Sequence, residues 1–112
     1  MAKGYWIVQS DINDMEQHQE YVRANRAVLG RYGARFLVRW GTQSIEEGTA
    51  RARQVVIEFP DFAAATSCYR DPEYAAAHAL RIGAAEGDVV IVEGYDGPQP
   101  VLLAEPGPGA GL

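Results

Sequence analysis

Three short segments of the chain carry apolar side chains at consecutive positions, where a strand with one wet face would alternate apolar and polar residues. These segments are residues 5–8, 55–57 and 89–92. Neighbouring side chains in a strand point to opposite faces of the sheet, so each segment presents apolar groups on both faces. A sheet built from such strands needs cover on both faces, and this requirement limits the folds that the chain can adopt.

The segments between these runs give the order of the elements. Asn13 followed by Glu16 has the spacing of a capping box, and Gly33 suits the position after a helix end. Asp61, and then Asp71 before a proline, provide two caps for a second helical segment that is interrupted after residue 69. The expected elements are strand 5–10, helix 14–32, strands 35–40 and 53–59, helical segment 61–82 and strand 88–95.

This β-α-β-β-α-β order predicts an α+β fold, the ferredoxin-like sandwich in which a four-stranded antiparallel sheet carries two helices on one face. Two helices shield only one face, and the other would expose an apolar area on the order of several hundred Å². We therefore expect a homodimer in which two copies pack sheet against sheet. The domain is expected at residues 1–96, followed by a mobile tail rich in proline and glycine at residues 97–112.

Net charge, cysteine content and the N-terminal sequence limit the partners, the thiol chemistry and the location that we expect. The net charge is -5 and the 10 Lys and Arg residues are scattered, so we expect no nucleic acid partner. The single Cys68 is expected as a buried, reduced thiol. The apolar run at residues 5–8 is too short for a signal peptide or a membrane span, so we expect a cytoplasmic protein without a membrane partner.

Familiar motifs for catalysis and cofactor binding are missing from the sequence. There is no GxSxG elbow, no nucleotide-binding glycine loop and no HExxH or CxxC pattern. Asp14 and His18 have a spacing that suits a metal, but no third ligand accompanies them. We expect neither a metal nor a cofactor.

Three polar side chains on the second helical segment form the main candidate site. Tyr74, His78 and Arg81 stand at positions i, i+4 and i+7, on one stripe of a helix with small alanine neighbours. In the functional interpretation, Arg81 binds a carboxylate or enolate, while His78 and Tyr74 are the candidate catalytic residues, moving a proton and donating a hydrogen bond. In the structural alternative, Tyr74 belongs to the core and His78 is solvated. Arg81 then pairs with Glu73 or Glu93.

Arg39 is a further candidate ligand-binding residue. It lies in the predicted strand at residues 35–40, where an unpaired guanidinium would be costly to bury. Its partner is either Glu47 or Glu58 in a structural ion pair, or the carboxylate of a ligand.

Aromatic residues of the strands are candidates for the wall of a cavity between sheet and helices. Trp6 is the candidate in the first strand, although aromatic residues on strands belong to the core more often than to a pocket. In the second strand, alternation places Phe36, Val38 and Trp40 on one face.

The predicted elements together resemble a known family, the domain-of-unknown-function family 1330. The matching segments are GYWIV at 4–8, YGARFLVR at 32–39, EEG at 46–48, VVIEFPDF at 55–62, DPEY at 71–74, Arg81 and EGDVVIVEG at 86–94. The resemblance covers about residues 3–95 and implies a dimeric α+β barrel. Two departures are Trp40, where a small residue is usual and where the added bulk reshapes any nearby cavity, and Asp71, where serine is common.

Two hypotheses of function follow. In the first, the protein binds a small, partly apolar or anionic molecule in a cleft between sheet and helices, without turnover. The ligand-binding residues would be Arg81, Tyr74, His78, Arg39 and Trp6. In the second, it is a cofactor-independent enzyme, similar to the monooxygenases and isomerases that share the dimeric barrel, acting on a small aromatic or keto acid. In that case, Arg81 stabilises developing negative charge.

Overall fold

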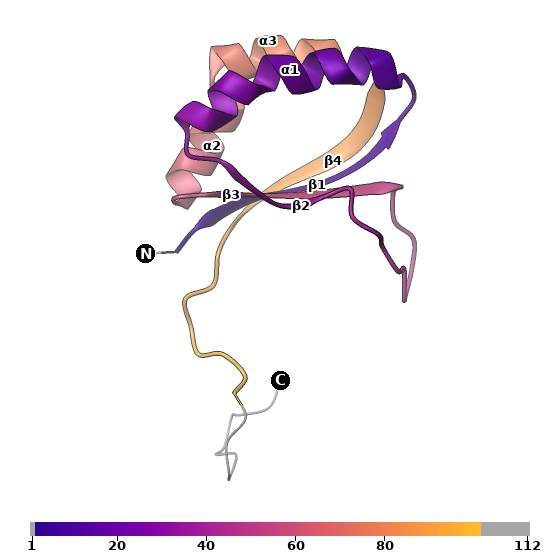
Figure 1. Ribbon diagram of the computed structural model, residues 1–112. Helices are drawn as coiled ribbons and strands as arrows, with labels where there is room; N and C mark the ends of the chain where they lie inside the picture. The colour runs from indigo at the N-terminus through magenta and orange to yellow at the C-terminus, as the bar shows by residue number, and fades with distance from the viewer. Residues whose placement is uncertain (1, 102–112) are drawn as a thin grey trace.

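The computed structural model describes residues 2–101, and the tail expected at 97–112 lies outside the described residues from position 102 onward. The helices and strands follow the predicted order (Figure 1). They are β1 (Gly4–Ile12), α1 (Met15–Arg31), β2 (Arg35–Arg39), β3 (Arg53–Phe59), α2 (Phe62–Arg70), α3 (Pro72–Arg81) and β4 (Ala85–Glu93).

The four strands form one antiparallel sheet in the order β2-β3-β1-β4. All helices lie on one side of this sheet, with α1 and α3 next to each other (Figure 1). The predicted α+β, ferredoxin-like architecture is therefore confirmed. The second helical segment consists of two helices, because Asp71 has an extended backbone that ends α2 and caps α3.

Aspartate side chains begin all three helices. Asp61 accepts a hydrogen bond from the backbone N–H of Ala64, and Asp71 accepts one from Glu73, as their positions predicted. The prediction for α1 was wrong by one residue. Asp14 rather than Asn13 is its cap and accepts from the N–H of Gln17.

The core lies between the helices and the covered face of the sheet. Its largest fully buried side chains include Trp6, Phe59 and Tyr74. The Trp6 indole donates a hydrogen bond to the carbonyl oxygen of Ala65 at 2.9 Å, which ties β1 to α2. Cys68 is buried as predicted, and burial raises the pKa of its thiol to about 12, so the group stays protonated.

A β-bulge in β2 overturns the predicted alternation of that strand. Phe36 pairs with Ile57 and Val38 pairs with Val56, so Leu37 is one residue extra. After the bulge the faces exchange. Phe36 therefore shares the helix-covered face with Arg39 and not with Val38.

The face of the sheet opposite the helices, here called the open face, carries a row of apolar side chains. Ile7 of β1 lies between Val56 of β3 and Val90 of β4, and Val38 of β2 completes the row. Val90 is 57% exposed, Val38 41% and Ile7 37%. The prediction that both faces of the sheet are apolar is confirmed, and no element in residues 2–101 covers this row.

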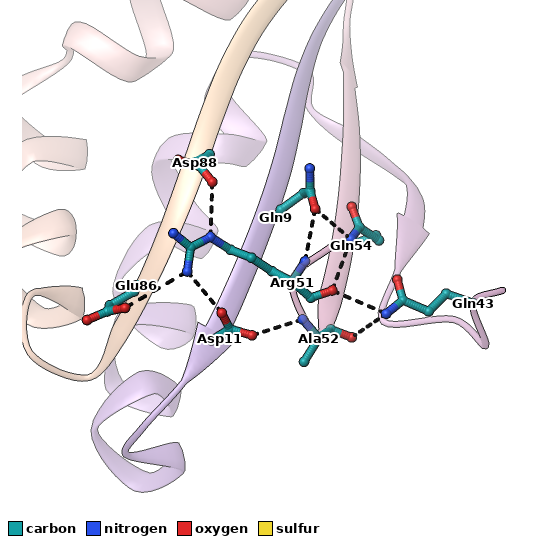
Figure 2. A network of polar contacts seen from close by, with 8 residues as sticks. All are labelled: Gln9, Asp11, Gln43, Arg51, Ala52, Gln54, Glu86 and Asp88. Atoms are coloured by element: carbon teal, nitrogen blue, oxygen red, sulfur yellow. Dashed lines mark hydrogen bonds and ion pairs between the residues drawn. The ribbon is translucent and has the colours of Figure 1, made fainter. Parts of the chain in front are cut away.

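One end of the open face is polar and is organised by Arg51, which precedes β3 (Figure 2). Its guanidinium donates to Asp11 of β1 at 2.9 Å and to Asp88 of β4 at 3.0 Å. The Asp11 carboxylate also accepts from the N–H of Ala52 at 2.9 Å. These contacts link the segment between β2 and β3 to strands β1 and β4. The apolar row ends where this polar group of residues begins.

Asp71 gives the fold a testable dependence on pH. It accepts hydrogen bonds from the Tyr32 hydroxyl, the Glu73 N–H and the Arg31 guanidinium, and these donors lower the pKa of its carboxyl. A carboxyl with a lowered pKa in the folded state stabilises the fold above the ordinary pKa of aspartate, and this stability is lost as the pH falls through the lowered value.

We therefore expect Asp71→Ala to lower the urea midpoint at neutral pH, and the difference from wild type to shrink at pH values below the ordinary pKa of aspartate. Asp71→Ser, which retains a capping oxygen, is the control and should lose less stability. Equal midpoints for wild type and Asp71→Ala at neutral pH, measured by circular dichroism, would contradict the assignment.

Candidate functional site

A cavity of about 60 Å³ lies between the helices and the covered face of the sheet, here called the inner cavity. Its floor comes from the sheet and includes Val8, Val55 and Val89. Its charged and titratable lining residues are His18, Tyr21, Arg39, Tyr74 and Arg81. No Asp or Glu is among the lining residues, so the inner cavity carries positive charge without an internal counter-charge.

Arg81 reaches this cavity from the last turn of α3. Its guanidinium carbon lies 5.4 Å from the centre of the Tyr21 ring. Neither predicted acidic partner holds it, because Glu73 pairs with Arg31 and Glu93 makes no ion pair among residues 2–101. Arg81 is half-buried, so its charge is directed at the cavity while part of the side chain stays hydrated.

Arg39 lies at the mouth of the inner cavity, where the bulge of β2 directs it. Its guanidinium carbon lies 4.3 Å from the centre of the Phe36 ring. The expected ion pair with Glu47 or Glu58 is not formed. Arg39 is exposed to water, so the cost of burial that would demand a fixed partner does not arise.

Tyr74 lines the inner cavity and also belongs to the hydrophobic core. It is 1% exposed, and its hydroxyl lies 2.7 Å from the hydroxyl of Tyr21. Burial is the main cause that raises the pKa of Tyr74 far above its ordinary value, so this phenol remains protonated. It supplies a hydrogen-bonding hydroxyl, and it is not a base near neutral pH.

His78 does not line the inner cavity, although it shares a sequence stripe with Tyr74 and Arg81. At about 100° per residue, His78 lies about 40° to one side of Tyr74, whereas Arg81 lies about 20° to the other. The first direction leads to α2, where the His78 ring lies 6.4 Å from that of Tyr69. Partial burial, followed by the charge of Arg81, lowers the pKa of His78.

His18 of α1 is the histidine that lines the cavity, and sequence reasoning missed it in this role. Only 6% of the residue is exposed. Its ring lies 5.5 Å from that of Tyr21 and 5.8 Å from that of Trp40. Burial, followed by the charges of three arginines, lowers the pKa of His18. The sequence did contain an indication of this role, because His18 lies among the apolar residues that repeat along the buried side of its helix.

Two tryptophans shape the inner cavity. Trp6 lines it from β1, but its N–H is already bonded to Ala65 and cannot serve a ligand. Trp40 lines it after the bulge, with a φ of 58° in the left-handed region. The guanidinium carbon of Arg53 lies 4.5 Å from the centre of the Trp40 ring, which holds this bulky side chain beside His18.

A second hollow, here called the outer groove, adjoins the inner cavity. It has a volume of about 210 Å³ and lies between α1 and β2. The two hollows share the lining residues Val22, Asn25, Phe36 and Arg39. The rest of the groove wall is formed by Arg26, Leu29, Gly30 and Ala34. The site is therefore a small chamber with mainly apolar walls and a few polar groups, which continues into a larger groove that has Arg26 and Arg39 in its wall.

Metal ligands do not gather in the described part of the chain. Within residues 2–101, no group of three or more His, Cys, Asp or Glu side chains is arranged to hold a metal ion. The Asp14 carboxylate, which has a metal-like spacing to His18, caps α1. None of the helices described has the length and apolar character needed to cross a membrane.

Comparison with known proteins places the chain in a structural context. The family profile described as Domain of unknown function (DUF1330) matches residues 3–95. A protein of unknown function from Rhodopseudomonas palustris has a similar structure, with a TM-score of 0.68 and 17% sequence identity over 86% of this chain and 85% of that chain. No curated protein is similar enough to count as a match.

Two further solved structures share the fold at lower identity. SnoaB, a cofactor-independent oxygenase from Streptomyces nogalater, has a TM-score of 0.58 and 10% identity, over 94% of this chain and 100% of its own. A dimeric ferredoxin-like protein of unknown function from Thermobifida fusca has a TM-score of 0.52 and 16% identity, over 82% of this chain and 89% of its own. At these identities the similarity establishes the fold alone.

Proposed function

The chain belongs to the family described as Domain of unknown function (DUF1330), and we propose that it is a homodimeric binding protein for a small carboxylic acid. The acid occupies the site formed by the inner cavity and the outer groove. Arg81 and Arg39 supply the counter-charge.

The charge distribution of the site carries this proposal. The protein as a whole has a net charge of -5, with 15 acidic residues against 10 basic ones. Even so, the inner cavity is lined by Arg39 and Arg81 and by no carboxylate. A planar guanidinium binds a carboxylate through two parallel hydrogen bonds, so an anion is the ligand that these side chains match.

The shape of the site adds an apolar body to this anion. The inner cavity, at about 60 Å³, is well below the roughly 150 Å³ of a cavity that binds benzene, so it admits a head group and not a ring. The outer groove, at about 210 Å³, has room for a larger group, which would contact the apolar side chains of Val22, Leu29 and Phe36. The ligand class is therefore an elongated acid with a carboxylate or keto-acid head and an aliphatic or aromatic body.

Self-association through the open face is the second part of the proposal. The row of Ile7, Val38, Val56 and Val90 lacks cover in the monomer, and exposed apolar rows of this kind commonly mark interfaces. A two-fold axis through the open face would bring two such rows together. The similar protein from Thermobifida fusca is described as dimeric, which supports self-association.

A cofactor-independent enzyme acting on a small aromatic or keto acid is the second candidate function. The observation that favours it is the presence of His18, Tyr21 and Tyr74 beside the arginines of one cavity. SnoaB, which shares the fold, is described as a cofactor-independent oxygenase. Oxygen uptake, or exchange of the acid's α-protons with heavy water, would distinguish turnover from binding.

Thermal-shift measurements with 3-phenylpropanoate test the binding proposal. The acid should raise the melting temperature of the wild-type protein in a concentration-dependent manner, because a ligand of the folded state stabilises it. Arg81→Ala should weaken binding about tenfold or more, which corresponds to a lost hydrogen bond between charged groups.

Two controls make this measurement specific. The neutral amide 3-phenylpropanamide has the same body without the charge and should not stabilise the protein. Arg23→Ala removes an arginine that pairs with Glu20 on the exposed side of α1, and it should bind the acid as the wild type does. Stabilisation of wild type and Arg81→Ala to the same extent would reject the proposed site.

Light scattering after size-exclusion chromatography tests the dimer. The wild-type protein should elute as a dimer at micromolar concentration, and Ile7→Glu should elute as a monomer, because it places a charge in the middle of the apolar row. Ile82→Glu changes an isoleucine that is 69% exposed just after α3, and it should leave the dimer intact. A monomeric wild type would refute this part of the proposal.

A further inference from the structure

His18 stands out because it is buried without any hydrogen bond. Only 6% of the residue is exposed, yet neither ring nitrogen bonds to another residue in the described part of the chain. A buried polar group of this kind normally has a partner, and its absence costs free energy. Because His18 lines the inner cavity, a molecule in that cavity can form a hydrogen bond with a ring nitrogen that faces it.

The two ring nitrogens of His18 have different surroundings. Nδ1 is completely enclosed and has no acceptor near it, and it is the one enclosed side-chain nitrogen or oxygen in residues 2–101 without a partner. A proton on Nδ1 would therefore be an unpaired donor in the interior. The neutral ring carries its single proton on Nε2 instead, the nitrogen that remains available to a molecule in the cavity.

The charges around His18 also oppose a second proton. In addition to burial, the positive charges of three arginines act on the His18 ring and lower its pKa: Arg39 of β2, Arg53 of β3 and Arg81 of α3. The titratable groups beside it are the hydroxyls of Tyr21 and Tyr74, which share a hydrogen bond with each other, and burial raises the pKa of Tyr74 far above its ordinary value. No carboxylate lines the cavity, so no lining residue favours the imidazolium form by an opposite charge.

We propose that His18 stays uncharged and donates a hydrogen bond from Nε2 to an oxygen of the bound acid, next to the charge of Arg81. The inference rests on the proposed function. It adds that His18 selects ligands whose head group has an acceptor oxygen. His18 does not remove a proton from the ligand. In this tautomer Nε2 has no free lone pair, so His18 is a hydrogen-bond donor and not a general base.

Nitrogen NMR and calorimetry test the protonation state. The chain has only two histidines, so the ring signals are readily assigned with a His78→Gln variant. The His18 ring should show the neutral form with the proton on Nε2 around neutral pH, both free and with 3-phenylpropanoate. The binding heat, measured in Tris and in bis-Tris, should reveal no proton uptake.

Substitutions test the hydrogen bond itself. His18→Phe keeps the packing and removes the donor, so it should weaken binding of 3-phenylpropanoate about tenfold. His18→Gln places an amide nitrogen near the position of Nε2 and should recover part of that loss. His78→Gln changes a histidine that lies outside the inner cavity, so this variant should bind the acid as the wild type does.

The outcomes separate the inference from the proposed function. If the acid binds but His18 becomes an imidazolium in the complex, carries its proton on Nδ1, or is replaced by phenylalanine without loss, the inference is wrong and the binding site stands. If the acid does not bind the wild type, both the inference and the proposed function are wrong.

Discussion

Helices cover one face of the four-stranded sheet, and the other properties of the molecule depend on this asymmetry. On the covered face, Trp6 and Ile57 meet the helices and form the core. On the open face, Ile7 and its neighbours in the row are equally apolar and have no cover within the described residues. The covered face thus accounts for the fold and the cavity, and the open face accounts for the proposed self-association.

The protein as a whole is acidic, yet its inner cavity is lined by positively charged side chains. The β-bulge at Leu37 is important here, because it turns Arg39 onto the covered face where simple alternation would not have placed it beside Phe36. The acids instead make external contacts, as Asp11 and Asp88 do with Arg51 (Figure 2). The arginines of the site are therefore available to a negatively charged ligand.

The sequence predicts the order of elements well because that order depends on local signals. Asp61 and Asp71 cap helices where their spacing to the following residues indicated, and the apolar run at residues 89–92 became a strand. The bulge at Leu37 was not predictable in this way. One extra residue in a strand leaves the composition unchanged, and its position is set by pairing with β3.

The site was only partly predictable for a similar reason. Arg81 and Tyr74 lie in the cavity as the stripe on their helix indicated, whereas His78 lies on the side of that stripe toward α2. Which edge of a helical stripe faces a cavity depends on the packing of neighbouring helices. His18 was overlooked because a histidine among apolar residues of a helix looks like part of the core until its missing hydrogen bonds are seen.

The most direct test of the account is a crystal structure of the protein with 3-phenylpropanoate. The account predicts the carboxylate in the inner cavity, within hydrogen-bonding distance of the Arg81 guanidinium, with the phenyl ring in the outer groove. A phenyl ring in the inner cavity with the carboxylate in solvent, or an acid bound elsewhere on the protein, would contradict it.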